Sequence, residues 1–304
     1  MTSLDSRAIP SGGVRFAPSP TGRFHIGNLR TAVVSKVIAD QLQLPWIVRF
    51  EDIDSPRVVP GAKGEQLADL RALDLIPDLV LVQSEFRGRH LALFERAVAS
   101  GQVYPCDCSR KEIQVQLSVL ASAPHQAAPT DYTGHCRDLP RARELRAQHS
   151  LAWRMRMPRA TGHDDFIVAR TLSDVATSFQ PSYQWACAID DLDGRYDLLV
   201  RAVDLRPSIP QQRAVQAWLM SCGESSAVEV PAVFHTSLVT LDGLRLEKRS
   251  RGVTLRELVV AGHSQKEILR VLQRSFAPTA LGAFAPGDVA GELAETIEFS
   301  CLFE

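Results

Sequence analysis

Patterns typical of strands and helices alternate along the first hundred residues, and this alternation restricts the fold more than any other feature. Residues 14–17 and 44–50 are short apolar runs of the kind found in buried strands. Helical spacing of apolar side chains predicts helices over 27–41, 62–75 and 87–100. Strands and helices that alternate at this spacing favour an α/β fold with a doubly wound, parallel (Rossmann-type) sheet.

The α/β pattern is interrupted once. Residues 106–179 are polar and rich in Arg and Pro, and 166–179 resemble an antiparallel hairpin. A strand at 198–203, a helix at 209–220 and a strand at 233–236 then resume the pattern. We expect three parts: a split Rossmann-type domain at 14–105 and 180–250, a subdomain inserted at 106–179, and a short helical region at 251–304.

Composition excludes few functions but argues against a membrane protein. The chain has 304 residues, of which 45% are hydrophobic, and a net charge of -1. No apolar run approaches the roughly 18 residues that cross a bilayer, and residues 1–13 lack the apolar core of a signal peptide. We expect a cytoplasmic protein, in which the six Cys are free thiols or metal ligands.

The turn between the first strand and the first helix carries the strongest chemical signal. It reads Arg-Phe-Ala-Pro-Ser-Pro-Thr-Gly from residue 15 and continues with His25, Ile26, Gly27 and Asn28. A helix N-terminus presents N–H groups that suit a phosphate, and His25 can donate a hydrogen bond as charge builds there. His25 alone would be read as a polar turn residue, but the whole string favours a nucleotide site.

This string resembles the HIGH signature of class I aminoacyl-tRNA synthetases, in the form used by their glutamyl members. Asn28 stands where the signature has its second His. The loop Arg-Phe-Glu-Asp-Ile-Asp at residues 49–54 is similar to the glutamyl pattern as well. The resemblance implies a synthetase that uses ATP with Mg²⁺, and it places His25, Gly27 and Asn28 at the ATP.

The second signature of the class, KMSKS, is matched by the sequence Arg-Leu-Glu-Lys-Arg at residues 245–249. The resemblance makes Lys248 a catalytic and ATP-binding residue, together with His25. A cation there would stabilise the pentavalent α-phosphate and the leaving pyrophosphate. Arg245 and Glu247 depart from the signature, and an unremarkable basic turn is the alternative interpretation.

L-Glutamate recognition needs a cation for the side-chain carboxylate and an anion for the α-ammonium group. The resemblance assigns the carboxylate to Arg15 and Arg201, the ammonium to Glu51, and the pocket wall to Tyr183. Arg201 is a charged residue inside an apolar run at a strand end, where open α/β sheets place their sites. The resemblance adds four residues of the first turn to the glutamate site: Phe16, Ala17, Pro18 and Ser19.

The predicted insertion contains a candidate zinc site. Two Cys one residue apart, Cys106 and Cys108, point the same way on an extended segment, and Tyr132 and Cys136 share a face if their turn is helical. The short glutamyl-queuosine synthetases resemble this chain in carrying Cys-x-Cys and Tyr-x-x-x-Cys as their Zn²⁺ ligands. Free thiols are the alternative, and His125 or His135 could replace Tyr132.

The acceptor is predicted from the same resemblance. About fifty residues follow Lys248, whereas full glutamyl-tRNA synthetases continue with a large anticodon-binding region. The resemblance therefore implies a monomer that glutamylates queuosine in the anticodon stem-loop of tRNA(Asp), with seven Arg between residues 137 and 159 as a candidate phosphate-binding face or a solvated helix. A truncated enzyme that charges the tRNA 3′ end and an inactive paralogue that binds RNA or protein are the alternatives.

Overall fold

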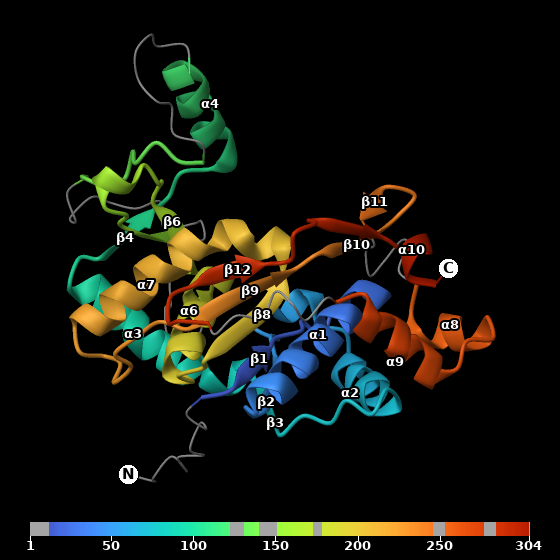
Figure 1. Ribbon diagram of the computed structural model, residues 1–304. Coiled ribbons are helices and arrows are strands. Elements are labelled where there is room, and N and C mark those ends of the chain that lie inside the picture. The colour runs from blue at the N-terminus through green and yellow to red at the C-terminus, as the bar shows by residue number, and fades with distance from the viewer. Residues whose placement is uncertain are drawn as a thin grey trace. The chain divides into compact units, whose positions relative to one another are not determined.

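The computed structural model describes residues 12–121, 131–139, 151–172, 178–245, 253–276 and 284–303 (Figure 1). The chain divides into two compact units. The first comprises Met1–Ser84, Asp190–Pro207 and Met220–Glu304, and the second comprises Glu85–Ile189 and Ser208–Leu219. The second unit thus begins ahead of the insertion predicted at residue 106 and includes parts of two later helices.

A parallel six-stranded sheet forms the first unit and confirms the predicted α/β class (Figure 1). Its order is β12-β9-β8-β1-β2-β3, and every neighbouring pair is parallel. The strands are β1 (Val14–Phe16), β2 (Trp46–Phe50), β3 (Leu79–Val82), β8 (Leu198–Ala202), β9 (Ala232–Thr236) and β12 (Val289–Gly291). The strand order reverses between β1 and β8, and open α/β sheets bind ligands beyond the carboxyl ends of the strands at such a point.

The two faces of this sheet differ in character because side chains alternate along each strand. One face packs against α1 (Ile26–Leu42) in a core that includes Phe16, Trp46 and Phe234. The register places Arg15 beside Ile47 and Leu199 on the opposite face. Arg49 and Arg201 lie two residues further along their strands, so three buried arginines share this polar face.

The last part of the first unit is a mixture of short helices and strands. The short helical region predicted at 251–304 contains α8 (Leu255–Val260) and α9 (Gln265–Arg274). Strand β12 was not predicted. The chain also forms a second small sheet. That sheet has the order β11-β10-β13 and contains β10 (Leu238–Leu241), β11 (Leu244–Arg245) and β13 (Thr296–Glu298). Three-residue strands are held by pairing with distant strands, so they leave little alternation in the sequence.

The second unit has an antiparallel sheet of order β4-β5-β6-β7. Its strands are β4 (Val103–Cys106), β5 (Leu151–Met155), β6 (Phe166–Thr171) and β7 (Gln180–Pro181). β6 pairs antiparallel with β7, but this second strand is very short and follows the range predicted for the hairpin, which ended at residue 179. The helices not yet named in either unit are α2 (Ala62–Ala72), α3 (Arg87–Ala99), α4 (Arg110–Ala121), α6 (Tyr183–Asp193), α7 (Ile209–Ser221), α10 (Ser300–Phe303) and the 3-10 turns Ser55–Arg57, Gln83–Phe86, Arg159–Thr161 and Val203–Ser208. None of the helices described is long and apolar enough to cross a bilayer.

Candidate active site

His25 ends the turn after β1 and caps the N-terminus of α1. Its backbone is extended (φ -87°, ψ 166°), and its Nδ1 accepts a hydrogen bond from the N–H of Gly27 at 3.1 Å. Because Nδ1 accepts this bond, the proton of the neutral ring is assigned to Nε2, which can donate. The N–H groups of Ile26, Gly27 and Asn28 are already bonded within the chain, so the turn presents the His25 donor at the positive end of the α1 dipole rather than free backbone donors.

Gly27 and Asn28 both support the position of His25. The side-chain oxygen of Asn28 accepts a hydrogen bond from the N–H of His25 at 3.4 Å and completes a capping box. A Cβ at Gly27 would lie 3.0 Å from the His25 ring and 3.7 Å from Cβ of Val239. Glycine at 27 thus lets the ring lie against the backbone, and Asn28 serves the cap in place of a second His.

The chain returns to this turn after the segment predicted to hold the second signature. Lys248 itself lies outside the described residues, so its role stays a prediction. Just beyond it, the N–H of Ile26 donates to the carbonyl of Val253 at 2.8 Å, and Thr254 forms an antiparallel bridge with His25.

The polar face of the sheet holds a buried cluster of arginines and acids. One oxygen of Asp191, in α6, accepts a hydrogen bond from Nη2 of Arg15 at 2.8 Å, and the other accepts one from Nη1 of Arg49 at 2.7 Å. Arg49 also donates through Nη2 to Oε1 of Glu51 at 3.1 Å. Arg201 is 4% exposed and lies close enough to act on the charge of Asp191.

Asp191 is a functional candidate that the sequence analysis missed. Burial alone would raise its pKa, but the positive charges of Arg15, Arg49 and Arg201 outweigh burial and hold the pKa below its ordinary value. Asp191 therefore stays ionised and orients two guanidinium groups. The signal available in the sequence was a pair of acids, Asp190 and Asp191, inside an otherwise apolar helical stretch.

The other predicted glutamate residues of the first turn have different positions. Phe16 packs in the core, with its ring centroid 6.5 Å from that of Trp46, so its side chain points away from the polar face of the sheet. Ala17, Pro18 and Ser19 form the turn between β1 and α1.

Two hydrogen bonds hold that turn in place. The carbonyl of Pro18 accepts a bond from the N–H of Glu51 at 3.0 Å, and the carbonyl of Ser19 accepts one from Gln66 at 3.2 Å. The first bond joins the turn to the acidic loop that follows β2. Tyr183 is the first residue of α6 and belongs to the second unit.

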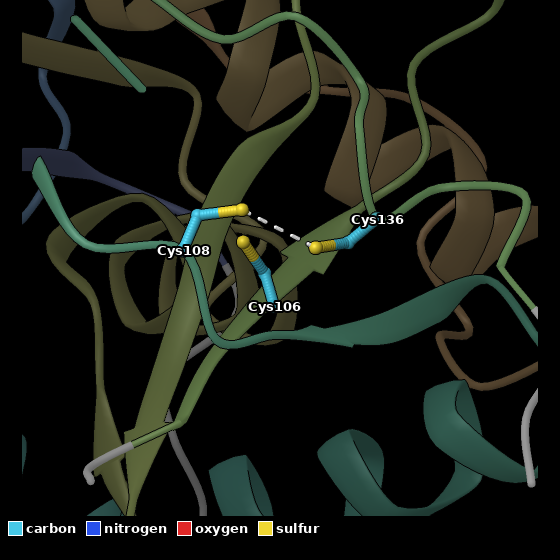
Figure 2. Close-up of side chains that lie close together, drawn as sticks. All are labelled: Cys106, Cys108 and Cys136. Atoms are coloured by element: carbon cyan, nitrogen blue, oxygen red, sulfur yellow. Dashed lines mark hydrogen bonds between the residues drawn. The ribbon is translucent and has the colours of Figure 1, made fainter. Parts of the chain in front are cut away.

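The second unit brings the predicted thiols together, as Figure 2 shows. The Sγ atoms of Cys106, Cys108 and Cys136 all lie within 4.8 Å of one another, and those of Cys108 and Cys136 are 3.4 Å apart. The Tyr132 hydroxyl is 3.5 Å from Sγ of Cys106 and accepts a bond from the N–H of Cys136 at 2.9 Å. Sulfurs on one tetrahedral zinc are about 3.8 Å apart, so the arrangement fits that ion.

The pKa values of the four predicted ligands are shifted in opposite directions: that of Cys106 is lowered, and those of Cys108, Cys136 and Tyr132 are raised. Hydrogen bonding from Cys136, aided by Tyr132, lowers the pKa of Cys106 to about 4 in spite of burial. The resulting charge, with burial, raises the pKa of Cys136. A thiolate is the form that binds zinc. In the described part of the chain this group contains no histidine; His135 is exposed, and His125 lies outside the described residues.

Of the seven arginines in the stretch at 137–159, Arg141, Arg143 and Arg146 lie outside the described residues, so a phosphate-binding face stays a prediction there, whereas three of the described arginines make bonds inside the second unit. Arg154 is 6% exposed and donates to the carbonyl of Asp165 at 3.0 Å. Arg137 bonds the carboxylate of Asp165 at 2.8 Å, and Arg156 donates to the carbonyl of Arg137 at 2.6 Å. These three side chains connect segments of the second unit. The high frequency of arginine in the sequence did not predict this structural role. The alternative of a solvated helix is wrong for the described part of the stretch.

Comparison with known proteins assigns the family. The model for "tRNA synthetases class I (E and Q), catalytic domain" matches residues 13–283. A glutamyl-Q tRNA(Asp) synthetase of Nocardia farcinica is 38% identical over 89% of this chain and 87% of its own length. The protein of the same name from Burkholderia cenocepacia is 34% identical over 79% of this chain and 81% of its own length.

Solved structures agree on the fold. A glutamate tRNA ligase from Elizabethkingia meningosepticum has a TM-score of 0.68 and 20% identity, with 91% of this chain and 63% of that chain covered. A glutamate-tRNA synthetase from Elizabethkingia anophelis has a TM-score of 0.67 and 21% identity, with 87% and 61% covered. The chain thus spans less than two thirds of these two structures. It is a ligase that belongs to the class I aminoacyl-tRNA synthetases for glutamate and glutamine, and within them to the glutamyl-Q tRNA(Asp) synthetases.

Proposed function

We propose that this enzyme, a cytoplasmic monomer, activates L-glutamate with ATP and Mg²⁺ and transfers it to queuosine in the anticodon loop of tRNA(Asp). In the first step, the α-carboxylate of glutamate attacks the α-phosphorus of ATP, and pyrophosphate leaves with the bonding electrons. In the second, a hydroxyl of the queuosine cyclopentene-diol attacks the glutamyl carbonyl. That hydroxyl loses its proton, and AMP leaves.

The observation that carries the activation step is the His25 turn. It supplies an Nε2–H donor and a helix N-terminus where the strand order of the sheet reverses. Both groups would stabilise negative charge on the phosphates, and more strongly as that charge grows in the transition state. Lys248, in a segment whose far end is bonded to Ile26, would add a cation for the leaving pyrophosphate.

The arginines of the polar face support glutamate as the amino acid. Arg201 and Arg15 would bind the side-chain carboxylate, Glu51 the α-ammonium group, and Tyr183 would complete the pocket. Because Asp191 already holds Arg15 and Arg49, these guanidinium groups are oriented before substrate arrives, which reduces the entropy lost on binding. The backbone of the turn at Phe16, Ala17, Pro18 and Ser19 would form the side of the pocket next to α1.

Zn²⁺ is the metal that the thiol cluster fits. Cys106, Cys108, Cys136 and Tyr132 would hold it, from two segments of the second unit that are about twenty-five residues apart in the chain. A structural zinc closes its coordination shell with protein ligands and stabilises the fold around them. We assign it no step in the reaction.

Queuosine is proposed as the acceptor because the relatives share the name glutamyl-Q tRNA(Asp) synthetase. A labelling experiment can test this acceptor directly. A queuosine-containing anticodon stem-loop of tRNA(Asp), without an acceptor stem, should incorporate labelled glutamate. The same stem-loop with guanosine at position 34 should not. Periodate oxidation of the queuosine diol before the assay should abolish incorporation.

Charging of the tRNA 3′ end is the second candidate, and the fold shared with glutamate tRNA ligases supports it. In that case unmodified tRNA(Glu) would be labelled, and oxidation of its terminal adenosine would abolish labelling. An inactive paralogue, suggested by Arg245 and Glu247 in the second signature, would show no glutamate-dependent exchange of labelled pyrophosphate into ATP. The exchange assay therefore separates the active candidates from the inactive one.

A further inference from the structure

The helix that follows His25 is held by a buried ion pair with the C-terminal segment. Arg30, in the second turn of α1, is fully buried. Its Nη1 and Nη2 donate to the two carboxylate oxygens of Glu292 at 2.7 and 2.5 Å. Its Nε and Nη2 donate to the hydroxyl and carbonyl of Ser275 at 2.9 and 3.0 Å. The guanidinium therefore fixes α1 through four hydrogen bonds.

Glu292 joins α1 to the end of β9. Its carboxylate also accepts a hydrogen bond from the N–H of Ser237 at 2.6 Å, and its own N–H donates to the carbonyl of His235 at 3.0 Å. Burial would raise the pKa of Glu292, but Arg30 and the Ser237 N–H lower it, so the carboxylate remains charged. One side chain thus connects α1 with the junction of β9 and β10.

A second carboxylate of the same segment holds the β10–β11 hairpin, and Val239 of β10 lies beside the His25 turn, with its Cβ 3.7 Å from the position that a Cβ would take at Gly27. Asp242 and Gly243 form the β10–β11 turn with positive φ angles of 53° and 72°. Glu298, in β13, accepts hydrogen bonds from both of their N–H groups, at 2.7 and 3.2 Å, and from the hydroxyl of Thr240 at 2.7 Å. A carboxylate therefore occupies the donors of a turn whose conformation few residues favour.

We propose that Glu292 and Glu298 are positioning residues for adenylate formation: Glu292 fixes α1, and with it the His25 turn, and Glu298 fixes the β10–β11 hairpin. The inference rests on the proposed activation of glutamate by ATP. It gives the segment from Val289 to Glu298 a role in the active site, although neither carboxylate touches substrate.

The physical argument is one of geometry more than of stability. A buried ion pair can often be replaced by packed apolar side chains with no loss of stability, because desolvation offsets its Coulomb energy. What the apolar replacement loses is the direction of the four bonds. A shift of about 1 Å at reacting groups can slow a reaction roughly 100-fold.

The first experiment uses single substitutions and pyrophosphate exchange. We expect Glu292→Ala and Glu298→Gln to lower kcat roughly 10- to 100-fold, with KM for ATP changed less than about threefold. Glu295→Gln is the matched control. Glu295 lies between Glu292 and Glu298 in the sequence, its side chain is 74% exposed, and the variant should keep wild-type kcat. Glu298 lies near the surface, so its variant should fold even if that of Glu292 does not. Wild-type kcat in Glu298→Gln and in folded Glu292→Ala would overturn the proposal.

A double variant separates positioning from stability. Arg30→Met with Glu292→Met should restore the melting temperature lost in Glu292→Ala but leave kcat low. Recovery of kcat together with the melting temperature would show that the pair acts only on folding, and the proposal would be wrong.

Hydrogen exchange gives a measurement that needs no activity. In Glu292→Ala, the amides of Ile26 and Leu29 should exchange at least about tenfold faster, while Glu295→Gln leaves them unchanged. Unchanged amide exchange in Glu292→Ala would show that Glu292 does not fix α1, and the proposal would be wrong. If the wild type shows no glutamate-dependent activity but the variant shows faster amide exchange, the proposed function is wrong. Glu292 would then still be the residue that fixes α1.

Discussion

Asp191 compensates the charge of the arginines on the polar face and orients their guanidinium groups. A guanidinium group buried without an acceptor would be costly, and Asp191 satisfies Arg15 and Arg49 with one oxygen each. The pairing also restricts where these side chains point, so a glutamate carboxylate would meet donors that are already aligned.

Replacing Asp191 with Asn should lower the free energy of unfolding at pH 7 by about 3–5 kcal/mol, because it leaves buried positive charge uncompensated. Asp40→Asn, on a side chain that is 62% exposed, should stay within about 0.5 kcal/mol. Urea denaturation measures both. Because the folded pKa of Asp191 lies below its unfolded value of about 3.9, its stabilisation is complete above that pH. The difference between wild type and Asp191→Asn should therefore be constant from about pH 5 to 7 and shrink as the pH falls from about 3.9 toward the folded pKa.

Gly27 offers a direct test of the His25 geometry. Gly27→Ala places a Cβ 3.0 Å from the ring, which must then rotate or shift. Pyrophosphate exchange should fall roughly 10- to 100-fold with little change in melting temperature. Gly64→Ala is the control, since a Cβ at that position in α2 meets nothing within 4 Å. Equal activity of the two variants would mean that the ring position does not matter for activation.

Residues that lie close in sequence were predictable, and residues brought together by sheet register were not. The residues that cap α1 lie within three positions of His25, so their spacing in the sequence is enough to predict the turn. Arg15 and Asp191 are 176 residues apart, and only the pairing of β1 with β8 and the placement of α6 make them neighbours.

At the scale of elements, the helices of the α/β pattern were predicted well, but α4, α6 and the short strands were not. The helix predicted at 27–41 is α1 (Ile26–Leu42), because an apolar pattern of that length has one regular explanation. Strands β12 and β13 have three residues each and depend on partners about fifty-five residues earlier. These strands are stabilised by pairing with segments far away in the chain, so no local sequence pattern predicts them.

The segment between β11 and α8 carries the prediction for Lys248. Lys248→Ala should lower pyrophosphate exchange about 100-fold or more while ATP binding weakens much less, because the cation acts mainly in the transition state. Lys266→Ala, on exposed α9, is the control and should exchange at the wild-type rate. A wild-type rate in Lys248→Ala would show that the second signature was assigned to the wrong segment.

At the scale of the whole molecule, the division into two units separates the two chemistries. The thiol cluster belongs to the second unit and His25 to the first. Purified protein should contain about one zinc per chain, and Cys106→Ser combined with Cys108→Ser should remove it. Cys301→Ser, outside this group and exposed, should keep the metal. Elemental analysis measures the zinc, and pyrophosphate exchange should survive its loss. A double variant that retains full zinc would exclude the site.

The ion pair of Arg30 and Glu292 also affects how this chain folds during synthesis. The two residues are 262 positions apart. At about 5–20 residues per second, the ribosome adds Glu292 roughly 13–50 s after Arg30. Throughout that interval α1 carries a guanidinium that the finished protein buries completely, and closing the core over it would strand a charge away from water. We expect the early α/β half of the nascent chain to stay loosely packed, and dependent on chaperones, until β12 has been translated.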